Sequence, residues 1–253
     1  MDHDITELLR DWAFDPDDQF RLVHAGDGRK VLQVRQPLGI EQYELSGRPD
    51  GKRPFGRESV LEEIQDRLDK SRADDGDDGS FSIDHEDFLR LQNEGVLYYY
   101  RYLILFQMGD FTRTVADTEH NLHLCDMVDK YGEPDDKKEI LQYRPYILRM
   151  FAISRAMLVL ANDDRDSAVD IVEAAIREIQ SMREVDTPTF QFERIRSIQY
   201  LRTALRQIRT KTIATGDKLQ RELDRAVEVE DYEEAARLRD QLAELESNSD
   251  TSG

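Results

Sequence analysis

The sequence has 253 residues, of which 35% are charged and 39% hydrophobic, a balance typical of charge-rich and largely helical proteins. No apolar run approaches the roughly 20 residues that a bilayer span needs, and the acidic start lacks a signal peptide's positive region, so we expect a cytoplasmic protein with no membrane partner. The net charge of -19 disfavours nucleic acid in general, and the single cysteine, Cys125, excludes an intramolecular disulfide and a paired-cysteine metal site.

The first 70 residues predict a small α+β module. After a short helix at 5–12, three strands separated by Gly- and Pro-containing turns form an antiparallel meander, and they are expected at 20–23, 31–36 and 40–45. In the second strand Leu32 and Val34 alternate with Gln33 and Arg35, which predicts one buried face and one wet face. The loop GRPDGKRPFG follows, and only its rigidity favours an enzyme site there.

A helix and an acidic segment close this module. Ser59 is expected to cap the helix, because Glu62 completes the serine-x-x-glutamate capping pattern. The helix is expected to end before residues 71–83, whose Asp and Gly residues predict a solvated linker. The carboxylates of this run lack the terminal glutamate of a calcium-binding EF-hand loop, so the linker is the favoured interpretation.

Residues 84–211 predict a helical domain, since the apolar spacing is helical almost throughout and breaks only at short polar segments. Within it, residues 97–122 and 151–176 resemble each other at an offset of 54 positions, and each predicts a helix, a tight turn and a second helix. The second copy carries Ala156, Ala168 and Ala175 where tetratricopeptide repeats place small residues. The first copy departs from this with Tyr102, Thr114 and Asn121. The domain therefore resembles degenerate tetratricopeptide-type repeats, and an ordinary antiparallel helical bundle is the alternative.

One group of side chains in this domain invites a metal hypothesis. His120 and His123 lie one helical turn apart, with Asp117 one turn before and Cys125 nearby. A diiron bundle would need Glu-x-x-His on two helices and two further glutamates, so solvated histidines on a helix face are the favoured interpretation. We expect no metal, no cofactor and no catalytic residue.

One basic helix interrupts the acidic sequence. It is predicted to turn one apolar side inward, formed by Ile195, Ile198, Leu201, Leu205 and Ile208. Its positive residues are Arg194, Arg196, Arg202, Arg206, Arg209 and Lys211, against Glu193 alone. We expect these arginines to answer the acidic surface of the protein itself, and contact with nucleic acid through Arg202, Arg206 and Arg209 is the alternative.

The segment 217–246 predicts a helical hairpin, and residues 247–253 predict a disordered tail. Asp217 is expected to cap the first helix, and the chain is expected to reverse around 229–231. Two helices of this length cannot cover each other's apolar residues fully, so a further surface is expected to lie against them.

This segment resembles the UVR motif, the small hairpin shared by the B and C subunits of the bacterial UvrABC excision nuclease. The resemblance rests on Leu219, Leu223, Ala226, Asp231, Tyr232, Glu233, Ala235, Ala236, Leu238, Arg239 and Asp240. Tyr232 stands where phenylalanine is commoner. In that family the hairpin joins a like hairpin into a four-helix arrangement, so the resemblance implies pairing with another protein. All of these residues except Asp231 are expected to bind the partner. Leu242 is expected to bind it as well.

The expected fold is mainly α with a small N-terminal antiparallel β meander, and the expected function is that of a non-enzymatic adaptor. The partner is expected to be a second copy or another protein with a UVR-type hairpin, giving a homodimer or a hetero-complex. The alternative is an accessory factor in DNA excision repair with weak nucleic-acid contact through the basic helix 194–211. No helicase motor, nuclease site or phosphate-binding loop is recognised in the rest of the sequence, so excision activity itself is not expected.

Overall fold

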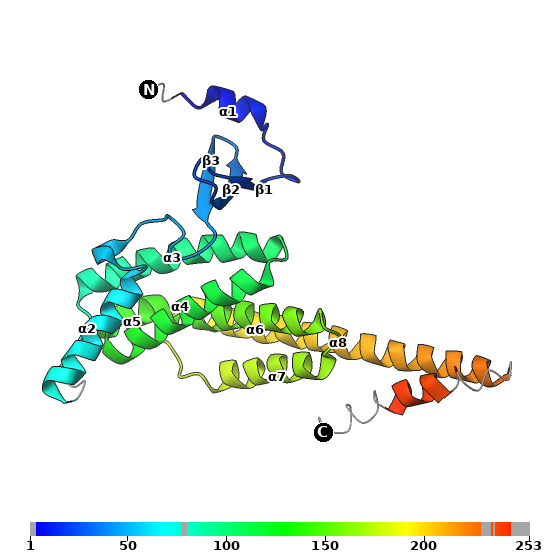
Figure 1. The fold of residues 1–253 in the computed structure, drawn as a ribbon. Coiled ribbons are helices and arrows are strands. Elements are labelled where there is room, and N and C mark those ends of the chain that lie inside the picture. The colour runs from blue at the N-terminus through cyan, green and yellow to red at the C-terminus, as the bar shows by residue number, and fades with distance from the viewer. Residues whose placement is uncertain (1–3, 77–79, 229–233, 235, 244–253) are drawn as a thin grey trace. The chain divides into compact units, whose positions relative to one another are not determined.

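The structure is a computed structural model that describes residues 4–76, 80–228, 234 and 236–243 (Figure 1). It is mainly helical with one small antiparallel sheet, as the sequence predicts. Contacts divide the chain into two units, Met1–Leu141 and Gln142–Gly253. This division falls inside the predicted 84–211 domain, whose two halves therefore belong to different units. None of the helices in the described ranges combines the length and apolarity required for a membrane span.

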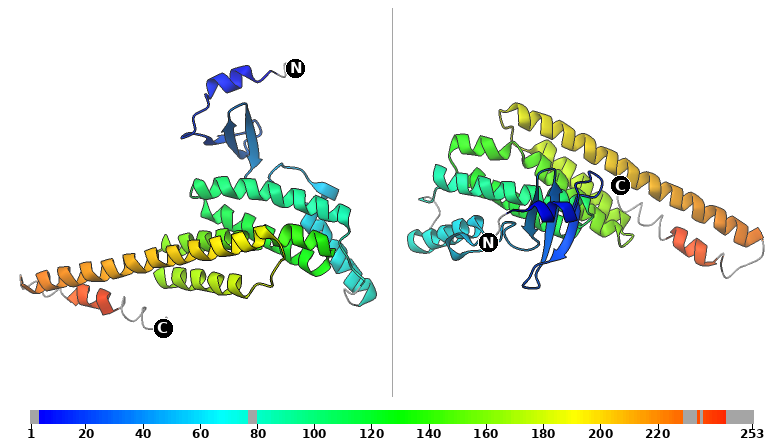
Figure 2. Two further views of the ribbon diagram at one scale, coloured as in Figure 1. Left: turned by 180° about the vertical axis from the view of Figure 1, so that it is seen from behind. Right: turned by 90° about the horizontal axis from the view of Figure 1, so that it is seen from above.

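The predicted meander is confirmed. Its strands, which are ordered β1-β2-β3 and are visible from two directions in Figure 2, are β1 (Phe20–His24), β2 (Lys30–Gln36) and β3 (Gly39–Glu44). In the antiparallel register Leu32 lies between Leu22 and Tyr43. Its core residues Leu32, Val34 and Tyr43 pack on Ile104 and Leu105 of helix α3 (His85–Gln107), so the strands are part of the first unit's core.

The prediction of one wet face is wrong at Arg35, which is 5% exposed. Its guanidinium donates to the carbonyls of Trp12 (2.6 Å), Leu9 (3.4 Å), Gly39 (3.2 Å) and Gln36. Two of these carbonyls end helix α1 (Thr6–Asp11), where backbone acceptors lack partners within the helix. A buried arginine can thus stand at a position that alternation assigns to solvent, because it satisfies several carbonyls at once.

The expected cap of helix α2 (Val60–Asp75) is confirmed, since Ser59 Oγ accepts from Glu62 N at 3.0 Å. The Glu62 carboxylate accepts from Glu58 N at 2.7 Å, one residue earlier than in a standard capping box. A short 3-10 turn, η1 (Pro54–Gly56), precedes the cap.

The segment 71–83 is not wholly a linker. Helix α2 continues to Asp75 and ends at Gly76, whose φ of 79° suits glycine. Further on, Ile83 is fully buried and its N–H donates to Tyr131 O at 2.9 Å. Composition marked this segment as solvated, but the hydrogen bonds that Arg72 and Ile83 donate to Tyr131 hold both of its ends.

Helices complete both units. In the first unit, α3 is followed by α4 (Phe111–Tyr131) and α5 (Pro134–Leu141). The second unit contains α6 (Arg144–Leu160), α7 (Arg165–Ser181) and α8 (Pro188–Glu228). Within it α8 packs against both α6 and α7. The predicted polar breaks between α3 and α4, α4 and α5, α6 and α7, and α7 and α8 are confirmed, whereas the break at 142–143 between α5 and α6 was not predicted.

Helix α8 differs from the prediction in two ways. It runs without interruption for 41 residues, roughly 60 Å, so Asp217 lies inside a helix and does not cap one. The stretch lacks proline, and one interior glycine costs only about 1 kcal/mol, so nothing local stops the helix at 211–217. Ile195 is 57% exposed, because it lies about 120° round the helix from the buried Leu201.

The internal resemblance at an offset of 54 residues extends to the backbone. Gly109 and Asp163, equivalent in the two copies, have φ of 76° and 58°. Their N–H groups donate to the carbonyls of Phe106 and Leu160, in each case at 3.1 Å. The two hairpins, α3–α4 and α6–α7, therefore reverse through the same turn.

The helices that follow these turns begin with the same kind of cap, and the buried positions of the two hairpins correspond as well. Asp110 accepts from Arg113 N and Asp164 accepts from Ser167 N, again 54 residues apart. Three pairs of equivalent positions are all at least nine-tenths buried, namely Tyr102 and Ala156, Thr114 and Ala168, and Asn121 and Ala175. Helical content alone supports the tetratricopeptide assignment weakly, whereas these matches establish a repeated helical hairpin.

Candidate partner-binding site

The described part of the C-terminal hairpin is held by a small apolar cluster. Leu238 is 3% exposed and packs against Leu219 and Leu223 near the end of α8. The sequence singled out all three residues, and the structure brings them together. The two halves of the hairpin therefore meet through these side chains.

The other side of the second hairpin helix is open. Ala236 is exposed, because it precedes Leu238 by two residues and so lies about 160° round the helix from it. Leu242, one turn after Leu238, is half-buried. The small side chain of Ala236 offers an outward surface that a second helix can approach closely.

Two charged side chains that were expected to bond across an interface are paired locally. Arg239 donates to Asp240 at 2.8 Å, and both side chains are 69% exposed. Such a solvated pair between neighbouring residues can exchange its partners readily, because water screens it. It therefore remains available to a partner.

Several predicted contacts cannot be placed. The side chains of Ala226, Tyr232, Glu233 and Ala235, and the tail 247–253, lie outside what the structure describes. The predicted interface therefore has described geometry at Leu219, Leu223, Ala236, Leu238, Arg239, Asp240 and Leu242.

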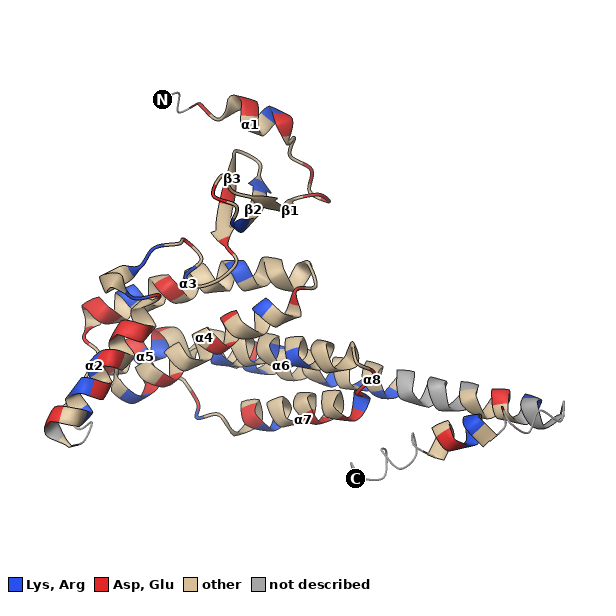
Figure 3. Ribbon diagram, viewed as in Figure 1, with Lys and Arg blue, Asp and Glu red and all other residues tan. Residues whose placement is uncertain are grey.

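The root of α8 in the second unit is well defined. Leu201 and Ile208 are buried, and Arg209 forms an ion pair with Glu173 of α7 at 2.6 Å. Arg202 and Arg206 are exposed, and the described basic positions of α8 are blue in Figure 3. Of the three candidate nucleic-acid contacts, Arg209 thus answers an acidic residue of the same unit, as the favoured interpretation of the basic helix predicted.

In the first unit a buried carboxylate, which the sequence analysis missed, joins three elements. Glu94 of α3 is fully buried and accepts from Val60 N (2.8 Å), Leu61 N (3.1 Å), Arg48 Nη1 (2.9 Å) and His120 Nε2 (3.2 Å). Burial by itself raises the pKa of the Glu94 carboxyl, but the hydrogen bonds from His120, Val60 and Leu61 outweigh it and hold the pKa below its ordinary value. The carboxylate therefore binds the positive end of α2 and fixes the GRPDG loop.

A second buried ion pair lies further along the same two helices. Arg101 of α3 donates to both oxygens of Asp117 on α4, at 2.6 and 2.8 Å, and to Glu44 O at 2.7 Å. The Tyr98 ring stacks on His120 with centroids 3.8 Å apart. The sequence did contain a signal for this network. Glu94 and Arg101 interrupt the apolar stripe that Leu91, Tyr98, Tyr102 and Leu105 form on α3.

Two candidate ligands of the metal hypothesis, Asp117 and His120, are engaged in these contacts. Asp117 is bonded to Arg101, and the His120 side chain is only 15% exposed rather than solvated. His123 is exposed and Cys125 is fully buried. Among the described residues, no group of three or more potential ligand side chains is arranged to hold a metal ion.

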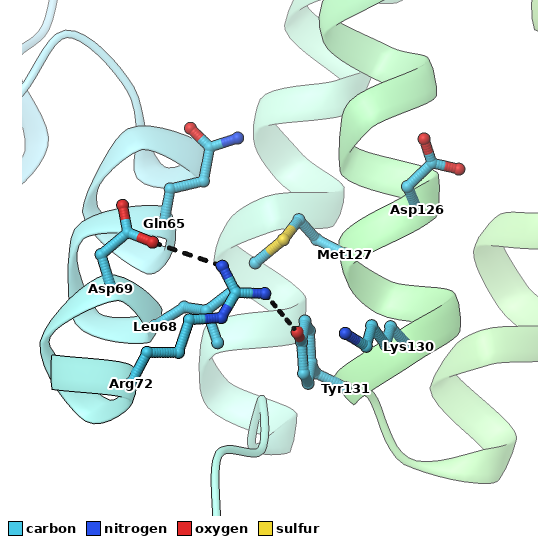
Figure 4. A pocket seen from close by; sticks show the side chains of 8 residues that line it. All are labelled: Gln65, Leu68, Asp69, Arg72, Asp126, Met127, Lys130 and Tyr131. Carbon is cyan, nitrogen blue, oxygen red and sulfur yellow. Dashed lines mark hydrogen bonds and ion pairs between the residues drawn. The ribbon is translucent and has the colours of Figure 1, made fainter. Parts of the chain in front are cut away.

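One surface depression lies between α2 and α4, and Figure 4 shows its lining. Arg72 reaches across it and bonds Tyr131 Oη at 3.2 Å and Asp69 at 3.4 Å. The residues around it are Gln65, Leu68, Asp126, Met127 and Lys130. Because the guanidinium ties α2 to α4, we interpret the depression as a packing feature.

The fold is that of a mainly helical protein with a small sheet and a C-terminal helical hairpin. The UVR family model, described as the UvrB/uvrC motif, matches residues 217–248. The chain therefore carries a UVR motif at its C-terminus, as the resemblance indicated. No curated protein and no solved structure matches the chain.

Proposed function

We propose that this protein is a non-enzymatic adaptor that pairs with another protein through its UVR-type hairpin. The observation that carries the proposal is the meeting of Leu238 with Leu219 and Leu223 within the matched motif. Among the described residues of the hairpin this cluster contains three leucines, and an isolated helical hairpin is marginal in water. A partner surface would supply the missing burial.

The geometry of α8 suits this role. The helix is anchored in the second unit through Leu201 and carries its apolar residues Leu219 and Leu223 on the same continuous helix. A continuous helix transmits position rigidly, so the hairpin is presented on a stiff arm. The open side around Ala236 is where a like hairpin would complete a four-helix arrangement.

Sedimentation equilibrium of the full chain tests this proposal. We expect a dimer for the unchanged chain and a monomer for Ala236→Asp, which places a charge on the outward face without touching the leucine cluster. Gln241→Asp adds the same charge to the same helix and should remain dimeric. A monomeric unchanged chain would exclude homodimerisation, and pairing with another UVR-type hairpin would then be tested with that protein.

Leu238→Asp separates pairing from hairpin formation. The substitution buries a charge in the cluster, so the hairpin itself should open and pairing should be lost with it. A chain that ends at Lys211 should behave in the same way. If either variant keeps the dimer mass, self-association does not depend on the hairpin.

The second candidate is an accessory role in DNA excision repair, which the UVR match favours because UvrB and UvrC carry this motif. The exposed Arg202 and Arg206 would contact phosphates. Titration of a DNA duplex at increasing salt distinguishes the candidates, because phosphate contacts predict steep weakening with salt. Absence of binding at every salt concentration would leave the adaptor role.

A further inference from the structure

An exposed face of α8, distinct from the hairpin, combines apolar and basic side chains. Phe192 and Ile195 are 59% and 57% exposed. Arg202 and Arg206, seven and eleven residues beyond Ile195, fall within about 20° of it round the helix and are exposed. We call Phe192, Ile195, Arg202 and Arg206 the basic face.

Such a face is unusual for this chain. The protein carries a net charge of -19, yet residues 191–211 of α8 hold six positively charged residues and one carboxylate, that of Glu193. Large exposed apolar residues beside arginines are the composition of protein-binding surfaces, where aromatic and Arg side chains contribute most. Charge complementarity indicates an acidic occupant with apolar residues of its own.

Helix α1 has this chemistry. None of its residues is buried, and Ile5 and Leu8, one helical turn apart, are 43% and 55% exposed. Asp11 and Glu7 lie about 60° and 100° round the helix from Leu8, beside this apolar edge and on the side away from Ile5. A helix of 6 residues is too short to be stable alone, so it gains from any surface that covers it.

The attachment of α1 leaves this apolar edge available. Arg35 binds the carbonyls of Leu9 and Trp12 at the end of the helix, and the Arg21 guanidinium lies 4.0 Å from the centre of the Trp12 ring. Both anchors act at the C-terminal end of α1. The preceding turn, with Ile5 and Leu8, is exposed to solvent.

We propose that α1 of a second copy of this chain docks on the basic face of α8, in a contact separate from hairpin pairing. Ile5 and Leu8 cover Phe192 and Ile195, while Glu7 and Asp11 pair with Arg202 and Arg206. Beyond the Debye length of about 8 Å the repulsion between two acidic copies is screened, so the local complementarity decides the contact. This inference goes beyond the proposed function, because it neither requires the hairpin nor follows from it.

Cross-linking between two full-length chains tests the contact. One chain carries Leu8→Cys, the other carries Ile195→Cys, and a short bismaleimide joins them if they meet. The native Cys125 is fully buried, and unchanged chains control for its reaction. We expect at least about tenfold more mixed adduct than with Ser181→Cys, an exposed control position on α7. Equal yields would overturn the proposal, as would linkage confined to single chains that carry both cysteines.

Charge reversal gives a second, independent readout. Arg202→Glu with Arg206→Glu in the Ile195→Cys chain should lower the adduct about tenfold, since like charges then face each other. Glu7→Arg with Asp11→Arg in the Leu8→Cys chain should restore it. Unchanged yields, or loss without restoration, would contradict the contact.

Two further arms separate this contact from other occupants. With Leu238→Asp in both chains the adduct should persist, and its loss would overturn the claim of a contact separate from the hairpin. A duplex oligonucleotide followed by fluorescence anisotropy should not bind this face. Binding that Arg202→Glu with Arg206→Glu abolishes would assign the face to nucleic acid and overturn the proposal.

Discussion

The hairpins α3–α4 and α6–α7 reverse through the same turn but are held together by different chemistry. In the first hairpin the interior includes the buried ion pair of Arg101 with Asp117. In the second, Arg155 and Ile171 stand at the positions of Arg101 and Asp117, and the interior contains the small residues Ala156, Ala168 and Ala175. Local backbone hydrogen bonds fix the turn, and they form with many different side chains nearby. The interior of a hairpin can be filled in different ways, provided that the side-chain volumes are complementary and the buried polar groups are hydrogen-bonded.

This difference predicts that the first hairpin is most sensitive to loss of charge. Asp117→Ala leaves the Arg101 guanidinium buried without its partner, and we expect the free energy of unfolding to fall by about 3–5 kcal/mol. Urea denaturation measures the loss. The double variant Arg101→Met with Asp117→Leu, which removes both charges, should recover most of it. A loss below about 1 kcal/mol for Asp117→Ala would show that the pair does not hold the hairpin.

Glu94 provides a pH test of the same unit. Its pKa is lowered, so its stabilising effect is present above the ordinary value of 4.5 and is lost as pH falls through the lower folded-state pKa. Glu94→Gln should reduce the free energy of unfolding by roughly 1.5–3 kcal/mol at neutral pH. The difference from the unchanged chain should shrink on acidification. Denaturation curves between pH 7 and pH 3 measure it, and a difference that grows toward low pH would reverse the assigned sign.

The second hairpin should respond to volume instead. Ala168→Leu adds methyl groups at a fully buried position, and we expect a loss of about 1–3 kcal/mol. The exposed Ala174→Leu on the same helix is the control and should change stability by less than about 0.5 kcal/mol. Thermal unfolding of both variants compares them. Equal effects would mean that the α6–α7 interior is not closely packed.

Substitutions in the shared turn are expected to change stability least. Gly109→Ala places a side chain at φ of 76° and should cost about 1 kcal/mol. Asp163→Gly relieves the same conformation, at φ of 58°, and should be neutral or stabilising by up to about 1 kcal/mol. Urea midpoints of the two variants should therefore move in opposite directions. Movement in the same direction would argue against equivalent turns.

Local patterns were sufficient for much of the molecule. Alternation located the three strands, polar breaks located the helix ends, and the Ser59 cap followed from the capping pattern. The 54-residue resemblance found both hairpins, and the hairpin residues Leu219, Leu223 and Leu238 were identified before their contact was known. Each of these features depends on neighbours in the sequence or on a motif within one segment.

Tertiary packing decided the rest. The sequence pattern placed Arg35 on a wet face and His120 in solvent, whereas backbone carbonyls and Glu94 hold these two side chains inside. It also ended α2 before residue 71, whereas the helix continues to Asp75. The sequence by itself determined the helical periodicity, the strands and the UVR motif, because hydrophobic spacing and caps act over a few residues. Only the tertiary structure decided which charges are buried, because a buried charge is stable only where distant segments supply its hydrogen bonds.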